Sequence, residues 1–346
     1  MSLKLKAVAV FLCVFISCLA ANLLIHRLII FPGFVELESE EARKDAQRAV
    51  QAINCEIKHL DEICHDWAAW DDTCDFASTR SEEYIKANFP ENLFKDLRLN
   101  LVCFYDKEGR LLYGQSRKAG TYEPLETALF ENRAISPDHA LLAFKNKNLP
   151  LGEMKTAGIF MTDQGFMLVA SRPILNSQNQ GPIGGTLIMG RLLDRAFVQT
   201  IAEQTEASLE ILPIQEGSLP MSLQKIVAEI SPDSPFRFEK KAGGVRCFTV
   251  LPDIEGRPAM LLNAKTTGTI SAIGASTTGY ALLIDSSAVF VMLLLALWML
   301  QTTVIGPMIR LSEHALSIEK DRDLSRRLSL PKSDEIGKLG YIFTTW

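Results

Sequence analysis

The segment HDWAAWDDTCDF, residues 65–76, holds two tryptophans, four aspartates, a histidine and a cysteine in one short stretch. Aromatic walls with a few carboxylates suit a small amine or amino acid, so Trp67, Trp70, Asp71 and Asp72 are candidate ligand contacts. The alternative is structural. Both tryptophans would bury aromatic surface against a sheet, and the aspartates would satisfy backbone donors where a helix ends. The residue types favour this structural role over ligand contact.

A second group of chemically capable residues lies just upstream. Cys55, His59, Glu62 and Asp66 are spaced four, three and four residues apart, which places them on one helical face with ligand types that suit zinc. One straight helix rarely supplies all four corners of a tetrahedron, and a polar stripe is usually a solvated face. We therefore predict no metal and no other cofactor.

Three further residues fall in apolar strand patterns. Arg172 and Arg191 would suit a carboxylate ligand if they face a pocket, and would otherwise mark a partly exposed strand edge. Tyr105 ends a strand and is a third candidate ligand contact.

Adjacent acids such as Asp71 and Asp72 could do acid–base chemistry, but they more often cap backbone groups. The sequence carries no nucleophile elbow, HExxH, phosphate-binding glycine loop or kinase signature, so we predict a protein that is not an enzyme.

Two apolar segments lie on either side of these residues. Residues 7–25 and 286–305 are nineteen and twenty positions long and carry no Asp, Glu, Lys or Arg. A hydrocarbon core about 30 Å thick needs a helix of roughly that length. Because apolar sequence resumes after Arg27, we predict membrane spans at 7–31 and 281–305. A cleaved signal peptide is the alternative for the first segment.

Basic residues predict the orientation of these spans. Lys4 and Lys6 precede the first span, Arg310 closely follows the second, and cytoplasmic flanks carry the excess of Lys and Arg. Residues 1–6 and the C-terminal tail are therefore expected in the cytoplasm, and residues 32–275 outside.

Composition bounds the function classes. The net charge of −5, from 36 basic and 41 acidic residues, gives no basic footprint for nucleic acid.

Five of the seven cysteines fall in a compartment that permits disulfides. These five are Cys55, Cys64, Cys74, Cys103 and Cys247. Cys55 and Cys64 would lie roughly 13 Å apart along one helix, too far to bridge each other.

The elements that position the candidate residues follow two periods. Apolar residues recur at steps of three and four from Ala42 to Trp67, with no Gly or Pro between Val35 and Asp75. This predicts a helix of about thirty residues, near 45 Å long, that can carry motion into the membrane. Strand patterns then occur at 99–106, 111–115, 156–162, 166–175 and 183–193, interrupted by expected helices near 124–132 and 137–146.

A weaker strand group follows within residues 196–275, so the exterior domain is predicted to be α+β, with a division into modules 35–195 and 196–275 left open. The run at 266–280 is either a linker or an extension of the next helix.

Beyond the second span, Met308, Leu311, Ala315 and Ile318 are spaced as coiled-coil a and d positions. With Pro307, DLSRRL (323–328) and DEIGKL (334–339), the tail at 306–346 resembles the HAMP linker family. The resemblance implies a homodimeric helical relay in which the relay residues are Pro307, Leu311, Asp334, Glu335 and Gly337. Arg322 stands where a glycine usually precedes the DL pair, and the HAMP domain is expected to be truncated at Trp346.

The exterior segment resembles the fourth class of CHASE extracellular sensor domains over residues of about 35–275. The resemblance rests on DWAAWDDTCDF, NLVCFYDKEGRLLY and GGTLIMGRLLD. It implies a PAS-like or Cache-like antiparallel sheet between two spans, feeding HAMP and then a histidine kinase of a two-component system or a diguanylate cyclase. Cys74 stands where the family usually has an aromatic residue, which weakens any role carried over to that position.

These features together predict a homodimeric receptor in the bacterial inner membrane. It would span the bilayer twice, bind a small molecule outside, and relay the signal to a downstream kinase or cyclase, with no nucleic-acid partner. The alternative is a membrane-anchored accessory binding protein, or a truncated receptor, that acts by pairing with another HAMP protein.

Overall fold

The computed structural model describes residues 3–127, 134–136, 138–142, 149–214, 219–241 and 243–321. The chain divides into two compact units. One, here the helical unit, comprises Met1–Glu36 and Ile270–Trp346, and the other, the sensor unit, comprises Leu37–Thr269. The predicted DLSRRL and DEIGKL motifs, with Asp334, Glu335 and Gly337, lie outside the described residues.

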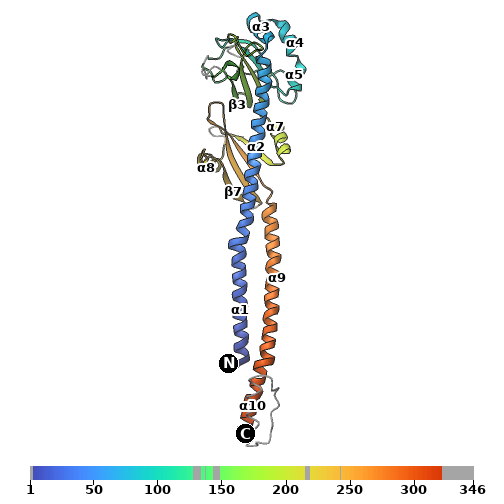
Figure 1. The fold of residues 1–346 in the computed structure, drawn as a ribbon, viewed down its shortest axis with the longest axis vertical. Coiled ribbons are helices and arrows are strands. Elements are labelled where there is room, and N and C mark those ends of the chain that lie inside the picture. The colour runs from blue at the N-terminus through green and yellow to red at the C-terminus, as the bar shows by residue number, and fades with distance from the viewer. Residues whose placement is uncertain are drawn as a thin grey trace. The chain divides into compact units, whose positions relative to one another are not determined.

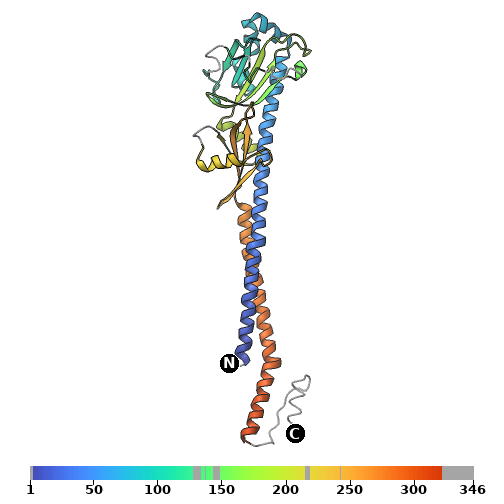
Figure 2. The ribbon, with the colours of Figure 1, turned by 90° about the vertical axis from the view of Figure 1, so that its left-hand side faces the viewer.

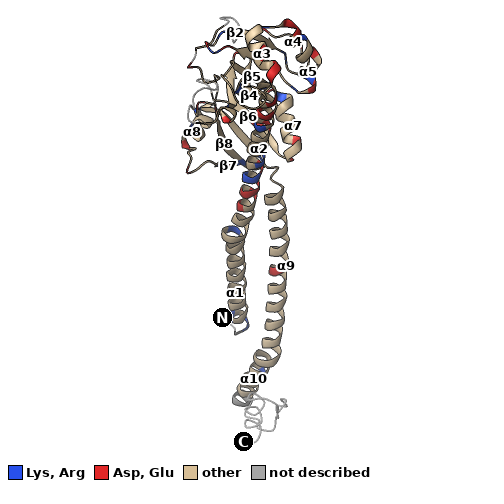
Figure 3. Ribbon diagram, turned by 45° about the horizontal axis from the view of Figure 1, so that its top comes forward, with Lys and Arg blue, Asp and Glu red and all other residues tan. Residues whose placement is uncertain are grey.

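The helical unit contains both apolar segments as helices (Figure 1). The first helical run is α1 (Leu3–Ile25) followed by a π-helical stretch, η1 (His26–Ile30). The second consists of α9 (Thr269–Leu300), the π-helical η3 (Gln301–Ile305) and α10 (Gly306–Asp321). The most apolar 18-residue windows of the two runs have mean hydropathies of 2.7 and 2.2. Both runs are long and apolar enough to cross a membrane. Figure 3 shows α1 and α9 almost without charged residues. The run at 266–280 is mostly helix, because α9 begins at Thr269.

The long helix α2 (Phe31–Ala68) follows η1 directly and has 38 residues, more than predicted. Its buried stripe has the predicted period and includes Ala42, Ala46, Ala49, Ile53, Leu60 and Cys64. The helix ends at Ala68 although neither Gly nor Pro is present. Trp70 is extended, with φ −137° and ψ 135°, and Ala69 forms a parallel bridge with Leu175. A tertiary contact therefore ends the helix where local sequence does not.

Three short helices that the sequence did not predict come next. They are α3 (Asp71–Thr79), α4 (Glu82–Asn88) and α5 (Glu91–Asp96). Ser81 caps α4 by accepting a hydrogen bond from the Tyr84 backbone N–H, and Pro90 immediately precedes α5. Each helix is too short to show the apolar period that marked α2.

The five predicted strands form one antiparallel sheet in the order β2-β1-β5-β4-β3. They are β1 (Leu101–Tyr105), β2 (Leu111–Ser116), β3 (Thr156–Thr162), β4 (Gly165–Pro173) and β5 (Thr186–Leu192), with a short 3-10 turn η2 (Leu151–Glu153) before β3. The expected helices near 124–132 and 137–146 are wrong over their described positions, 124–127 and 138–142, which are turns and irregular chain. At the described positions tertiary contacts are made instead: the Thr127 hydroxyl donates to the Asp163 carboxylate, and Leu141 and Leu142 pack into an apolar cluster with Tyr105.

A second antiparallel sheet has the order β6-β9-β8-β7. After α7 (Arg195–Thr205) come β6 (Ser208–Pro213), α8 (Met221–Glu229), β7 (Arg237–Lys241), β8 (Gly244–Pro252) and β9 (Pro258–Lys265). Residues of both sheets share one core with α2, which runs beside both in Figure 2. The predicted α+β class with antiparallel sheets and a long leading helix is confirmed.

Candidate functional site

Trp67 and Trp70 lie at the corner between α2 and α3, where they pack into an aromatic cluster. Their rings meet edge to face with centroids 5.9 Å apart, and Trp67 also lies 4.8 Å from the Phe89 ring. Trp70 lies 6.4 Å from Tyr84, whose hydroxyl contacts Thr73. Both indoles are partly buried against the main core. This packing gives the two tryptophans a structural role, as the residue types favoured.

Asp71 and Asp72 occupy the exposed first turn of α3. The Asp71 carboxylate accepts a hydrogen bond from the Ser177 backbone N–H at 3.0 Å, and the Asp71 N–H donates to the Ser177 hydroxyl at 3.2 Å. Hydrogen bonding of the Asp71 carboxylate to the Ser177 backbone N–H, and next to the Ser177 side chain, lowers the pKa of Asp71. Asp71 therefore ties the helix corner to the loop between β4 and β5, as the backbone-capping interpretation expected.

Arg172 is buried and bound by a carboxylate of the chain itself. Its Nε and Nη2 donate to the two oxygens of Asp61 on α2 at 2.6 and 2.7 Å, and its Nη1 donates to the Gly152 carbonyl at 3.0 Å. Lys155 adds a second cation, 2.8 Å from Asp61. Burial alone would raise the pKa of Asp61, but hydrogen bonds from Arg172 and Lys155 outweigh it and hold the pKa below its ordinary value.

Arg191 is the second buried arginine on the face of the sheet toward α2. It forms an ion pair with Glu56 on α2, and its Nε and Nη2 donate to the carbonyls of Arg98 and Leu97 at 3.0 and 2.9 Å. Burial lowers the pKa of Arg191, and the neighbouring Glu56 opposes that shift. The strand-edge alternative is wrong for both arginines, because β4 and β5 are interior strands and α2 covers their guanidinium groups.

Tyr105 lies on the other face of the same sheet. It is 1% exposed, in a separate apolar cluster with Cys103, Val169 and Leu141, and burial raises its pKa well above the ordinary value. The sequence candidates therefore occupy three places: the α2–α3 corner, the α2 face of the sheet, and the opposite face. They do not form one pocket.

The four possible metal ligands on α2 all point to solvent. Cys55, His59, Glu62 and Asp66 are exposed, and Glu62 lies 3.5 Å from Lys58. Within the described ranges, no group of three His, Cys, Asp or Glu side chains is placed to hold a metal ion. The polar stripe has the geometry of a solvated helix face.

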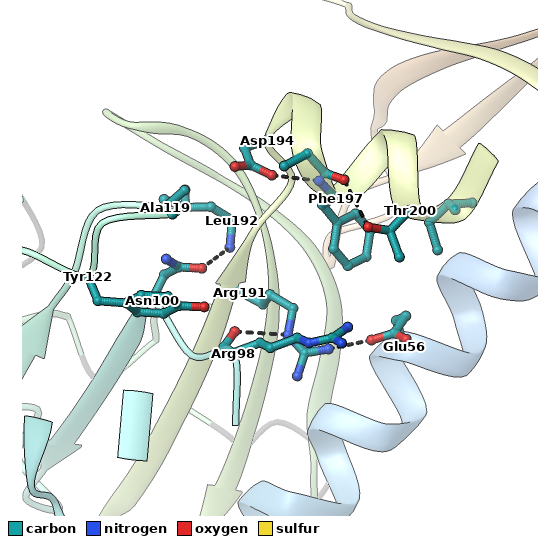
Figure 4. Close-up of a pocket in the computed structure, with 13 residues that line it drawn as sticks. Glu56, Arg98, Asn100, Ala119, Tyr122, Arg191, Leu192, Asp194, Phe197 and Thr200 are labelled. Carbon is teal, nitrogen blue, oxygen red and sulfur yellow. Dashed lines mark hydrogen bonds and ion pairs between the residues drawn. The ribbon is translucent and has the colours of Figure 1, made fainter. Parts of the chain in front are cut away.

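The described part of the sensor unit contains a cavity of about 220 Å³ beside Arg191. We call it the junction cavity, because α2, the α5–β1 connection, β5 and α7 all contribute to its wall (Figure 4). The thirteen residues that line it are Glu56, Arg98, Asn100, Ala119, Gly120, Tyr122, Arg191, Leu192, Asp194, Ala196, Phe197, Thr200 and Ile201.

Polar and apolar side chains line different parts of the junction cavity. Arg98, Arg191 and Glu56 lie together at one side, and Asp194 lies at the start of α7 at the other (Figure 4). Asp194 caps α7 by accepting from the Phe197 backbone N–H at 2.8 Å. A few convergent polar groups against an apolar wall are typical of small-molecule sites.

Sequence reasoning selected Arg191 but missed Glu56, Arg98 and Asp61. A signal for the two acids was present, since Glu56 and Asp61 directly flank the apolar positions Ile57 and Leu60 of the α2 stripe. Acids beside a buried stripe need cationic partners, and buried arginines on strands are natural ones. No comparable pattern marked Arg98.

The relay residues within the described chain lie on α10. Pro307 directly follows the π-helical stretch η3 within one continuous helical run, and Leu311 lies one turn later with part of its side chain covered.

Comparison with known proteins gives a family for the sensor unit. Residues 52–212 match the CHASE4 domain family. The methanogenesis regulatory histidine kinase FilI of Methanothrix harundinacea (strain 6Ac) is 26% identical over 245 residues, which are 70% of this chain. The chain spans about a quarter of that relative's length, 26%. It thus contains a CHASE4 extracellular sensor domain, homologous to a histidine kinase sensor domain.

Solved structures add distant similarities. A domain of a sensory box/GGDEF family protein from Vibrio parahaemolyticus is 13% identical with a TM-score of 0.48, covering 69% of this chain and 99% of that one. The V. cholerae histidine kinase DctB sensor domain is 11% identical with a TM-score of 0.37, covering 65% and 95%. The ligand-binding domain of the Pseudomonas aeruginosa PAO1 amino acid chemoreceptor PctB, in complex with L-Arg, is 12% identical with a TM-score of 0.39, covering 73% and 98%.

Proposed function

We propose that this chain is a transmembrane receptor that binds a small extracytoplasmic signal and relays it through a HAMP linker. The observation that carries the proposal is the position of the CHASE4 match. Residues 52–212 lie between two helical runs that are each long and apolar enough to cross a membrane. A sensor domain placed between two spans has a physical connection to the cytoplasm on both sides.

The orientation follows from the basic flanks. Lys4, Lys6 and Arg310 border the apolar helices, whereas residues 266–285 contain no Lys or Arg. This distribution supports cytoplasmic termini and an extracytoplasmic sensor unit in the cell membrane. The protein acts in this proposal by binding and conformational change, without catalysis.

The relay rests on two continuous helices. The first helical run extends from Lys4 to Ala68, so one helix belongs to both the apolar segment and the sensor core. The second extends from Thr269 to Ser317 and includes Pro307 and Leu311. A ligand that binds one packing of α2 better than another would bias both helices in a homodimer, and the HAMP seam would pass the bias to a histidine kinase or diguanylate cyclase.

Reporter fusions test the topology. Alkaline phosphatase, which needs an extracytoplasmic location to become active, is fused after residue 150 or after residue 340. We expect activity only at 150, with the reverse pattern for a cytoplasmic fluorescent reporter. Equal activity at both positions would end the proposal, because the sensor unit would then lie on the side of the tail.

A further inference from the structure

We propose that the junction cavity binds a small carboxylate between Arg98 and Arg191, in competition with Glu56. This inference rests on the proposed sensor function and deepens it by naming the ligand class and the site. It concerns the α2 face of the first sheet, away from Tyr105 and the opposite apolar face.

The charges around the cavity favour an anion at its basic side. Arg98 and Arg191 both line it. Burial lowers the pKa of Arg191, and the positive charge of Arg98 lowers it further. Glu56 is the carboxylate bound to Arg191, whereas the Arg98 side chain forms no ion pair with any residue that the structure describes. Asp194 holds the first turn of α7 across the cavity. Two guanidinium groups therefore face one neighbouring carboxylate.

The partners of Arg191 show which contact a ligand could replace. Two of its nitrogens are held by backbone carbonyls, those of Arg98 and Leu97, which stay in place as long as the chain is folded. The third donates to the Glu56 side chain. A ligand carboxylate can take the place of Glu56 like for like, because the guanidinium keeps its orientation and an ionised oxygen partner.

The walls limit the size of this ligand. The cavity volume of about 220 Å³ lies below the roughly 300–1,000 Å³ of sites for drug-sized molecules. Phe197 and Ile201 supply apolar surface next to the charged groups. A short monocarboxylate with an aliphatic tail matches both the volume and this division.

Backbone conformation gives independent support for a ligand site in this cavity. Arg98 and Tyr122 have φ of 53° and 57°, the left-handed region that side chains other than glycine rarely adopt. They are two of the five non-glycine residues with positive φ in the described chain, and both line this cavity. Such strained positions gather at ligand sites, where the fold holds a side chain in place for a partner.

Replacement of Glu56 would have a direct effect on α2. Glu56 joins that helix to β5, and Asp61 joins it to β4 through Arg172. A bound carboxylate would release the first tie and leave the second. The ligand would thus change how α2 is held against the sheet, which is the change that the relay needs.

The test measures binding to the full chain in detergent micelles by equilibrium dialysis. The ligands are radiolabelled straight-chain monocarboxylates from acetate to hexanoate, and n-alkylamines of the same chain lengths. We expect at least one carboxylate to bind and no amine to bind more tightly. Arg98→Gln should weaken carboxylate binding at least about tenfold, because a charged hydrogen-bond donor is lost.

Two further variants make the result specific. Arg80→Gln is the matched control, since Arg80 is also an exposed arginine in the left-handed region, with φ 59°, and lies outside the junction cavity. It should bind as the wild type does. Glu56→Gln should bind the carboxylate more tightly than the wild type, because a neutral amide competes less well for Arg191.

Several results would overturn the inference. They are the absence of binding by any carboxylate, equal carboxylate binding by the wild type and Arg98→Gln, or weaker carboxylate binding by Glu56→Gln, which would show that Glu56 does not compete with the ligand. The receptor function would survive each of them, because the reporter fusions do not depend on this cavity.

Discussion

Asp61 is a buried carboxylate that forms ion pairs with both Arg172 and Lys155. Asp61→Asn would leave the Arg172 guanidinium buried without an anion. We expect a loss of roughly 3–5 kcal/mol in the free energy of unfolding, measured by denaturant titration of the full chain. Glu62→Gln is the control, since Glu62 is exposed and its removal should change stability by no more than about 0.5 kcal/mol. Equal stability of the two variants would contradict the structural role of the Asp61 cluster.

The same carboxylate gives stability a pH dependence. The pKa of Asp61 is lower in the folded chain than its ordinary value near 3.9. The folded state therefore binds fewer protons, so the contribution of Asp61 is fully present above about pH 4 and is lost as pH falls through the folded pKa. The stability gap between the wild type and Asp61→Asn should narrow over that acidic range. A gap that widens on acidification would refute this sign.

Burial also sorts the cysteines by reactivity. Cys55 is exposed and Cys74 partly buried, whereas Cys64, Cys103 and Cys247 are buried, and burial raises the pKa of Cys247 to about 12. Because only the thiolate reacts, a membrane-impermeant maleimide should label Cys55 rapidly in the native protein and the three buried thiols only after unfolding. The Cys55→Ser/Cys74→Ser variant should show no rapid labelling in the sensor unit, as read by mass spectrometry. Rapid labelling of that variant would mean that the core opens.

At the scale of elements, the connection from β9 to α9 depends on a close glycine contact. Gly268 has φ 73°, and a Cβ there would lie 2.8 Å from the Gly243 carbonyl carbon in the β7–β8 turn. Gly268→Ala should therefore cost about 1–2 kcal/mol for the left-handed backbone and roughly 1–3 kcal/mol more for the clash. Gly256→Ala isolates the first cost, because Gly256 has φ 83° and open space around it. Unfolding midpoints that coincide for the two variants would show that the clash is relieved.

At the scale of the whole molecule, the proposed relay depends on the apolar seam of α10. Leu311 occupies a predicted core position of that seam and its side chain is partly covered. In a chimera of the full chain with a histidine kinase output, Leu311→Glu should make autophosphorylation insensitive to the signal, because a charge cannot enter the seam. Ser312→Glu, at the exposed neighbouring position, should respond normally. A normal response from Leu311→Glu would show that the relay does not depend on this seam.

Local sequence determined the elements that a short-range pattern can encode. The apolar segments, the stripe of α2 and the strand groups of both sheets were predicted because burial imposes a period on neighbouring residues. The same reasoning underestimated the length of α2, which begins at Phe31, and it placed helices near 124–132 and 137–146 that the described positions 124–127 and 138–142 do not form. The PAS-like assignment and the HAMP relay stay predictions.

Tertiary structure decided which charged groups meet. Asp61 and Arg172 are 111 positions apart, and Glu56 and Arg191 are 135 apart, so no local period relates them. Arg98 enters the junction cavity only because the α5–β1 connection, β5 and α7 converge there. The sequence supplied acids beside one stripe and arginines in two strands. Their pairing followed from packing α2 across the sheet, since a buried charge is stable only where an opposite charge is brought to it.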